Sequence, residues 1–252
     1  MTSVTATVAR QFSRAASSYD ALAAIQQRIA GQGMALLPPR PGTLLDIGCG
    51  TGANTAALAA KGYSSTGLDL APGMVSYAAR QYPHIVFCEG DAQALPFASN
   101  HFLYAFSSMA LQWCASPLTT MTELVRVLQP GGQASITIMV DNSFSQLDAA
   151  RQAVGLAPAT NRLACHKEWE TAIKTAGLKI LTARHTRYTD RFSDILSLLR
   201  SIKAVGAGTR LAPGKDQHLS RPMLNALSQA YERDLSHLLP LTYQVSHFLL
   251  EK

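Results

Sequence analysis

The sequence contains few cysteines, and their spacing gives no sign of disulfide bonds or of a shared metal site. Its four cysteines are scattered, and they form neither a CxxC pair nor a cluster with histidine at metal-ligand spacing. This pattern argues against a disulfide framework and gives no indication of a zinc site. We therefore expect reduced, partly buried thiols and a protein without a bound metal.

Long apolar runs are also missing. No segment approaches the roughly 18 consecutive apolar residues that a membrane-spanning helix needs. The first residues, MTSVTATVARQFSRAASSYD, lack the continuous apolar stretch of a secretory signal. These absences favour a cytoplasmic protein that does not enter a membrane, and an apolar content of 47% is ample for a buried core.

The formal net charge is +6, and most of the excess lies in the second half of the chain. Residues 1–140 carry 7 Lys and Arg against 6 Asp and Glu, whereas residues 141–252 carry 15 against 10. Within residues 184–210, six basic residues accompany only Asp190 and Asp194. Such a segment suits an acidic partner or substrate, and the alternative is a solvated basic surface without a ligand.

Strand and helix patterns alternate through the region before Val140. Short apolar runs predict strands, and alanine-rich or amphipathic segments between them predict helices. The predicted strands are 43–48, 64–70, 84–91, 101–108 and 133–140, and the predicted helices are 52–62, 71–81 and 117–132. This alternation is typical of right-handed β-α-β units, which build a mostly parallel sheet with helices on both faces.

The flanking segments extend the pattern. Apolar residues at helical spacing predict helices over about residues 7–36. After Val140, the sequence predicts helices at 143–154, 167–176, 193–204 and 220–238, and strands at 178–189 and 241–250. The predicted fold class is therefore α/β, with a doubly wound, mostly parallel seven-stranded sheet.

We expect a single domain over residues 1–252. Residues 1–38 would form an N-terminal helical cap, 39–140 a cofactor-binding core and 141–252 the C-terminal half. Helices inserted at about 191–238 would form a lid over the carboxyl edge of the sheet, where open α/β folds bind ligands.

Residues 44–52, LLDIGCGTG, are the most informative stretch. A strand that runs through a glycine loop into a helix brings backbone amides close to a ligand, because glycine has no side chain to block the approach. The segment GCGTGA also satisfies the dinucleotide fingerprint GxGxxA, with Asp69 nineteen residues beyond Gly50. A nicotinamide-binding oxidoreductase is therefore one interpretation.

Three features count against a dinucleotide. Asp46 precedes the first glycine, where a carboxylate would repel a pyrophosphate and favour a cationic ligand. The chain contains no YxxxK, and Asp91 adds a carboxylate after the third strand. Three acids at successive strand ends, Asp46, Asp69 and Asp91, suit a ligand with an ammonium group, a diol and an adenine amino group. S-adenosylmethionine has all three and a positively charged sulfonium.

Four segments together resemble the successive signature segments of class I S-adenosylmethionine-dependent methyltransferases. They are LLDIGCGTG, GLDLAPGMV, EGDAQALPF and ELVRVLQPGG, and they cover about residues 40–140. The resemblance implies that the glycines underlie the methionine portion, Asp69 holds the ribose hydroxyls, and Asp91 with the Ala92 backbone meets the adenine. The cofactor-binding residues expected on this basis are Tyr19, Asp46, Gly48, Gly50, Asp69, Leu70, Asp91, Ala92 and Met109.

Further segments resemble one family, the malonyl-acyl carrier protein O-methyltransferases of biotin synthesis. They are FSRAASSYDALAAIQ, SSMALQWC, LLRSIKAVGAGT and the closing PLTYQVSHFLL, so that the likeness covers nearly the whole chain. NRLACH at 161–166 follows the family pattern only loosely. The resemblance implies methylation of the free carboxylate of malonyl-acyl carrier protein, with S-adenosylhomocysteine as the second product. SSMALQWC differs from the (N/D)PP(Y/F) of amino-methylating enzymes, so a nucleic-acid substrate is not expected.

The acceptor determines which side chains the reaction needs. A carboxylate is already ionised at neutral pH, so no base is required, and the scattered histidines indicate none. Arg200 and Lys203 lie three residues apart on a predicted lid helix and would orient the malonyl carboxylate. Tyr19 would pack over the donor, and Trp113 would form a wall of the acceptor pocket or lie in the core. The basic residues of 184–210 would meet the acidic carrier protein.

Two other functions stay open on this evidence. One alternative is a methyltransferase that acts on another small acceptor, such as a quinone precursor. The other is a nicotinamide-dependent oxidoreductase.

Overall fold

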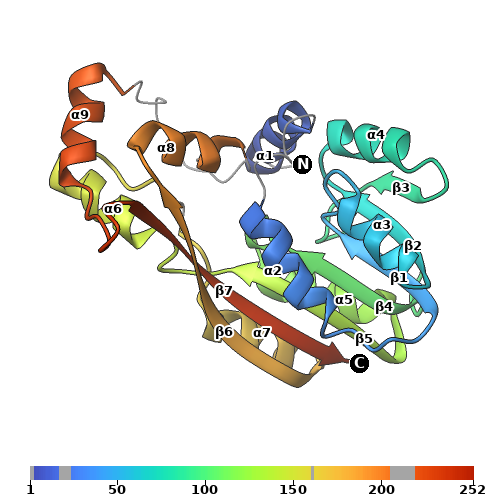
Figure 1. Ribbon diagram of the computed structural model, residues 1–252. Coiled ribbons are helices and arrows are strands. Elements are labelled where there is room, and N and C mark those ends of the chain that lie inside the picture. The colour runs from blue at the N-terminus through green and yellow to red at the C-terminus, as the bar shows by residue number, and fades with distance from the viewer. Residues whose placement is uncertain (1–2, 17–23, 160–161, 205–218) are drawn as a thin grey trace.

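The computed structural model describes residues 3–16, 24–159, 162–204 and 219–252 (Figure 1). In this part of the chain, seven strands form one sheet in the order β3-β2-β1-β4-β5-β7-β6. The strands are β1 (Gly42–Ile47), β2 (Tyr63–Asp69), β3 (Val86–Glu89), β4 (Phe102–Ser108), β5 (Leu128–Met139), β6 (Lys179–Phe192) and β7 (Leu239–Glu251). Strand β7 is antiparallel to its neighbours β5 and β6, while β1 to β5 pair in parallel. The predicted fold class is confirmed.

The helices alternate with these strands along the chain. They are α1 (Ser3–Ala15), α2 (Ala24–Met34), α3 (Ala53–Ala60), α4 (Pro72–Gln81), α5 (Pro117–Val127), α6 (Ser145–Ala153), α7 (His166–Thr175), α8 (Ile195–Ala204) and α9 (Arg221–Ala230), with a 3-10 turn η2 at Leu111–Trp113. None of the described helices is long and apolar enough to cross a membrane.

The sheet is covered on both faces because its central strands are apolar on both sides. On one face, Ile136 and Phe248 pack with Met121 of α5 and Trp169 of α7 in one buried cluster. On the other face, Leu44 of β1 packs with residues of α2 and α3. Burial of each large apolar side chain contributes roughly 1.5–3 kcal/mol, so these two clusters hold the layers together.

The helix predicted at 220–238 is shorter than expected, and it ends at Ala230. The Asp234 carboxylate accepts hydrogen bonds from the backbone N–H groups of Ser236 and Leu238 at 2.9 and 3.1 Å. Such side-chain bonds stabilise a turn in competition with a helix. The sequence prediction overlooked this turn, which leads the chain into β7.

Helix α1 lies at the carboxyl end of the sheet, beside α4. Ala9 of α1 and Ala16, which follows that helix, pack with Ala71 and Met74. The Ser13 hydroxyl of α1 accepts a hydrogen bond from the N–H of Gly73 at 3.1 Å. Figure 1 shows α8 on the same side of the sheet edge as α1. The lid proposed at about 191–238 includes α8, α9 and residues 205–218, and the last of these lie outside the described residues. Its closing function stays a prediction.

Candidate active site

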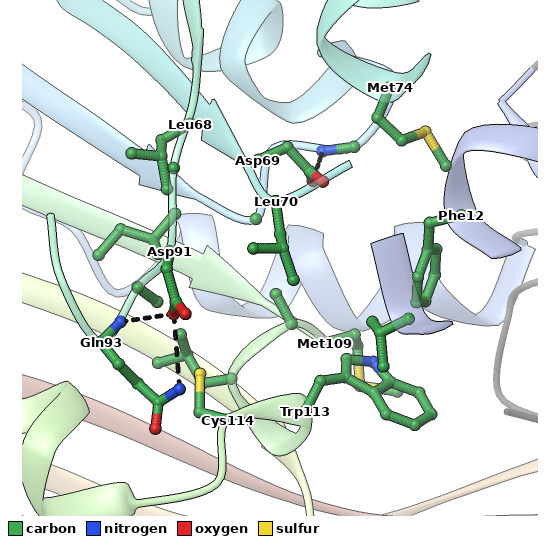
Figure 2. A pocket seen from close by; sticks show the side chains of 18 of the residues that line it. Phe12, Leu68, Asp69, Leu70, Met74, Asp91, Gln93, Met109, Trp113 and Cys114 are labelled. Carbon is green, nitrogen blue, oxygen red and sulfur yellow. Dashed lines mark hydrogen bonds between the residues drawn. The ribbon is translucent and has the colours of Figure 1, made fainter. Parts of the chain in front are cut away.

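A pocket opens at the carboxyl edge of the parallel strands, under α1 (Figure 2). Its walls come from the loops that follow β1, β2, β3 and β4, together with α1. It is lined by Val8, Phe12, Ile47, Gly48, Gly50, Leu68, Asp69, Leu70, Met74, Gly90, Asp91, Ala92, Gln93, Ser108, Met109, Ala110, Leu111, Trp113 and Cys114. This is the edge at which the sequence predicted the ligand.

The glycine loop turns sharply after β1. The N–H groups of Gly48 and Cys49 both donate to the carbonyl oxygen of Leu68, at 2.7 and 3.0 Å, which anchors the loop to β2. Gly48 has φ 76°, and a Cβ placed on it would lie 2.2 Å from the Cβ of Ala110. Glycine is therefore required here both for the backbone conformation and for the close approach of the β4 loop.

We expect Gly48→Ala to lower the free energy of unfolding by about 2–3 kcal/mol, since the left-handed conformation and the contact with Ala110 both oppose the side chain. Gly62→Ala is the matched control, because Gly62 has φ 96° but open space around its missing Cβ. Urea denaturation of both variants measures the two costs. Equal losses for Gly48→Ala and Gly62→Ala would show that the close approach to Ala110 has no energetic weight.

Asp69 connects the glycine loop to the β2 turn. One carboxylate oxygen accepts from the N–H of Gly50 and the other from the N–H of Ala71, both at 2.8 Å. Burial raises the pKa of this carboxyl, and the backbone N–H groups of Ala71 and Gly50 oppose that shift. Because each oxygen has a further lone pair, the carboxylate can still accept hydrogen bonds from a ligand.

Asp46 lies outside the pocket lining, and its predicted contact with the cofactor stays a prediction. It is 1% exposed, is absent from the pocket lining, and accepts a hydrogen bond from the Thr55 hydroxyl of α3 at 2.6 Å. Burial raises its pKa to about 7. The side chain points under the loop because residues alternate along β1, and its role there is to fix the loop against α3.

Asp91 is held at one end of the pocket. Its Oδ1 accepts from the N–H of Gln93 at 2.9 Å and lies 3.5 Å from the Gln93 side-chain amide nitrogen. The Gln93 side-chain oxygen in turn accepts from the N–H of Ser116 at 3.0 Å. This network joins the loop after β3 to the start of α5. Asp91 stays on the pocket wall, where Figure 2 shows it bonded to Gln93, and Ala92 also lines the pocket.

The opposite end of the pocket is aromatic. The rings of Phe12 and Trp113 meet edge to face with their centroids 5.9 Å apart, and Figure 2 shows both far from Asp91 and Gln93. Met109 lies beside them with φ 55°. An elongated ligand therefore meets carboxylates at one side and an apolar, water-excluding wall at the other.

Cys114 also lines the pocket without being a reactive group. Burial raises the pKa of its thiol to about 11, so the thiol stays protonated at neutral pH. A protonated thiol is a poor nucleophile, which argues against covalent catalysis by this residue.

The structure brings together most of the predicted cofactor residues. Gly48, Gly50, Asp69, Leu70, Asp91, Ala92 and Met109 all line the pocket. Trp113, predicted as a wall of the acceptor pocket or a core residue, lines it as well. Phe12 and Val8 of α1 and Ser108 of β4 were missed. The only available signal for Phe12 and Val8 was their four-residue spacing on an amphipathic helix.

Not all of the predicted site residues are part of this lining. Arg200 lies exposed on α8 and is absent from the lining of the described pocket, so that its predicted part in orienting the malonyl carboxylate is not tested by this arrangement. Tyr19 and the side chain of Lys203 lie outside what the structure describes. Their assigned roles therefore stay predictions.

The charges of the pocket indicate which ligand it fits. Among the described residues that line it, Asp69 and Asp91 are acidic and there is no Lys, Arg or His. Two carboxylates without a cation would repel a pyrophosphate. The same carboxylates attract a sulfonium and accept hydrogen bonds from an amino group and a ribose diol. The residues present fit S-adenosylmethionine better than a dinucleotide.

Comparisons with known proteins agree with this reading. A family model described as a methyltransferase domain matches residues 45–136. A malonyl-[acyl-carrier protein] O-methyltransferase from Erwinia pyrifoliae is 37% identical over 97% of this chain and 92% of its own length. The chain belongs to the malonyl-[acyl-carrier protein] O-methyltransferase family. The family resemblance stated from the sequence motifs is thereby confirmed.

A second relative of this chain is about twice as long as the chain itself. The biotin biosynthesis bifunctional protein BioHC from Cellvibrio japonicus is 38% identical over 97% of this chain, and the chain spans 50% of its length. The match therefore concerns one half of that bifunctional protein.

Solved structures support the fold alone. A Bacillus halodurans structure assigned to the methyltransferases superposes with a TM-score of 0.64 at 15% identity, covering 88% of this chain and 98% of the other. The [4+2]-cyclase SpnF superposes with a TM-score of 0.57 at 20% identity, covering 89% and 80%. Since a cyclase shares this fold, the reaction has to be argued from the site and from the sequence family.

Proposed function

We propose that this protein transfers a methyl group from S-adenosylmethionine to the free carboxylate of malonyl-acyl carrier protein, forming a methyl ester. The observation that carries the proposal is the near full-length relationship to malonyl-[acyl-carrier protein] O-methyltransferases at 37% and 35% identity. The negatively charged pocket under the glycine loop supports the same donor.

The donor supplies a methyl group bonded to a positively charged sulfur. Asp69 would hold the ribose hydroxyls, Asp91 and Ala92 the adenine, and the glycine loop would admit the methionine portion. Phe12 and Trp113 would keep water from the reacting end, because their rings close the apolar wall. The chain mainly has to align two reactants, and alignment alone can lower a barrier by several kcal/mol.

The chemistry of the acceptor fits a pocket whose described lining contains no histidine or lysine to act as a base. A malonyl carboxylate has lost its proton at neutral pH, so the side chains need only orient it. Cys114 is protonated, and His247, whose pKa is lowered by burial, lies 4% exposed on β7 against Tyr188. Neither residue is placed to remove a proton in the pocket. A phenol or carbon acid, as in the quinone-precursor alternative, would require such a group.

We assign the acceptor carboxylate to Arg200, whose planar guanidinium suits a carboxylate. Because α8 carries this residue outside the pocket lining, the role requires the acceptor to bind between α8 and the pocket or α8 to approach it. We expect Arg200→Ala to reduce kcat/KM for malonyl-acyl carrier protein about 30-fold, which is a typical loss for a charged hydrogen bond. The dissociation constant of S-adenosylmethionine should stay unchanged.

Lys174→Ala is a suitable control for that variant, since Lys174 is an exposed cation on α7. Steady-state kinetics with malonyl-acyl carrier protein, together with calorimetric titration of the donor, measure both quantities. Unchanged turnover in Arg200→Ala would remove this residue from the acceptor site.

Docking of the acidic carrier protein would use the basic residues of 184–210. Arg184 and Arg187 are exposed on β6. Arg191 already pairs with Asp234 at 2.7 Å, which reduces its share of the free charge. Association driven by such a surface should slow as salt is raised, because surface charges are screened.

The deciding experiment is mass spectrometry of malonyl-acyl carrier protein after incubation with the protein and S-adenosylmethionine. A mass gain of one methyl group, absent with the acyl carrier protein that lacks the malonyl group, supports the proposal. Methylation of a small phenolic acceptor but not of the malonyl thioester would favour the alternative acceptor class. Tight binding of a nicotinamide cofactor with no donor binding would overturn methyl transfer altogether.

A further inference from the structure

The last residue of β4, Ser108, lies on the pocket wall and its side chain is hydrogen-bonded to the neighbouring strand. Ser108 lines the pocket and pairs in register with Thr137 of β5. The Thr137 hydroxyl donates a hydrogen bond to the Ser108 oxygen at 2.9 Å, and Thr137 is fully buried. The Ser108 oxygen therefore already accepts a hydrogen bond from the protein, and the Ser108 O–H group can still donate one to another acceptor.

This arrangement makes Ser108 a stronger donor than an isolated serine. In a chain of two hydroxyls, the first bond polarises the second, and the effect grows where water is excluded. The next residue, Met109, lies at the aromatic end of the pocket beside Trp113 (Figure 2). The Ser108 hydroxyl is thus available on the wall of the pocket that the end of β4 forms.

The charges of the pocket indicate which kind of group accepts the hydrogen bond from the Ser108 hydroxyl. Both ligands of the proposed reaction carry a carboxylate, and among the described lining residues no cationic side chain is present to meet one. A carboxylate bound here needs neutral donors. Of the other lining side chains, Gln93 is engaged with Asp91 and Ser116, and the Cys114 thiol is a weak donor, which leaves the Ser108 hydroxyl and the Trp113 indole N–H as neutral donors.

We infer that the Ser108 hydroxyl, oriented by Thr137, donates a hydrogen bond to a ligand carboxylate in this pocket. The inference rests on the proposed function. The carboxylate belongs either to the amino-acid portion of the methyl donor or to the malonyl acceptor, and the chemistry recognised is the same. Ser108 would be a binding residue and Thr137 a positioning residue that acts through it.

Calorimetric titration of Ser108→Ala separates the two sources. S-adenosylhomocysteine carries the amino-acid carboxylate, whereas 5′-methylthioadenosine lacks it. If Ser108 binds the donor carboxylate, the affinity of Ser108→Ala for S-adenosylhomocysteine falls about 10- to 30-fold. Its affinity for methylthioadenosine then stays within about twofold of that of the unmodified protein. If the malonyl carboxylate is bound, both affinities are retained and KM for malonyl-acyl carrier protein rises by the same factor.

Two variants control for damage to the fold. Ser135→Ala removes a hydroxyl on the same strand as Thr137, equally buried, which donates to the carbonyl of Gly33 at 2.7 Å and does not line the pocket. It should leave all three constants unchanged. Thr137→Val keeps the side-chain shape but removes the donor to Ser108, so we expect it to change the same constant as Ser108→Ala, by about threefold.

The inference is overturned if Ser108→Ala matches the unmodified protein within twofold in every constant, or if methylthioadenosine binding falls as much as S-adenosylhomocysteine binding. The proposed function fails in a different way. In that case the unmodified protein itself would bind neither S-adenosylmethionine nor S-adenosylhomocysteine.

Discussion

Asp69→Ala is expected to weaken S-adenosylmethionine binding at least 100-fold, or about 3 kcal/mol. The carboxylate accepts from the N–H groups of Gly50 and Ala71 and is assigned to the ribose hydroxyls. Its removal therefore takes away both the proposed ligand contact and the anchor that holds the glycine loop against β2. Isothermal titration calorimetry with S-adenosylmethionine and S-adenosylhomocysteine measures the effect.

Glu89→Ala provides the matched control for this loss of charge. Glu89 is the partner of Asp69 in the β2–β3 register, but it is exposed and lies outside the pocket lining. Long-range electrostatics alone would weaken cation binding similarly in both variants, whereas direct contact affects only Asp69→Ala. Donor binding by Asp69→Ala within threefold of the unmodified protein would contradict the assignment.

Asp46→Asn is expected to gain stability relative to the unmodified protein as the pH rises. The folded-state pKa of Asp46 is about 7, against 3.8 in the absence of burial. Between these values the folded protein holds a proton that the unfolded chain has lost, so the unmodified protein loses stability as pH rises. An asparagine has no such ionisation, and the difference should change by about 3 kcal/mol between pH 5 and pH 8.

Urea denaturation at several pH values measures this difference, and Thr55→Val tests its cause. The Thr55 hydroxyl donates to Asp46 and opposes the rise of its pKa. Without that donor, the buried charge is less stabilised, so Thr55→Val should lose more stability at pH 8 than at pH 5. A stability difference between Asp46→Asn and the unmodified protein that is the same at every pH would show that the carboxyl is not strongly perturbed.

The glycine loop and the acid at the end of β2 were predictable from local sequence. An apolar strand, a glycine-rich turn and an alanine-rich helix each follow from short-range preferences, and Asp69 comes directly after the next strand. Because parallel strands end at the same edge of the sheet, these residues had to converge. The structure places Gly48, Gly50, Asp69 and Asp91 around one pocket accordingly.

Asp46 shows where such reasoning stops. Its position two residues before Gly48 suggested a ligand contact, but the alternation of side chains along β1 directs it under the loop to Thr55. The same limit applies to the aromatic wall. Phe12 lies in the first helix, about a hundred residues from Trp113, and only the packing of α1 beside α4 brings the two rings into contact.

The sequence by itself determined the α/β class, the family and the glycines and acids that line the pocket, because these depend on local patterns and on motifs in one segment each. Only the tertiary structure decided that Asp46 supports the loop, that Phe12 closes the pocket and that Thr137 orients Ser108. Each of these depends on which face of a strand or helix meets a distant segment. That choice is made by the packing of the whole sheet and its two layers of helices.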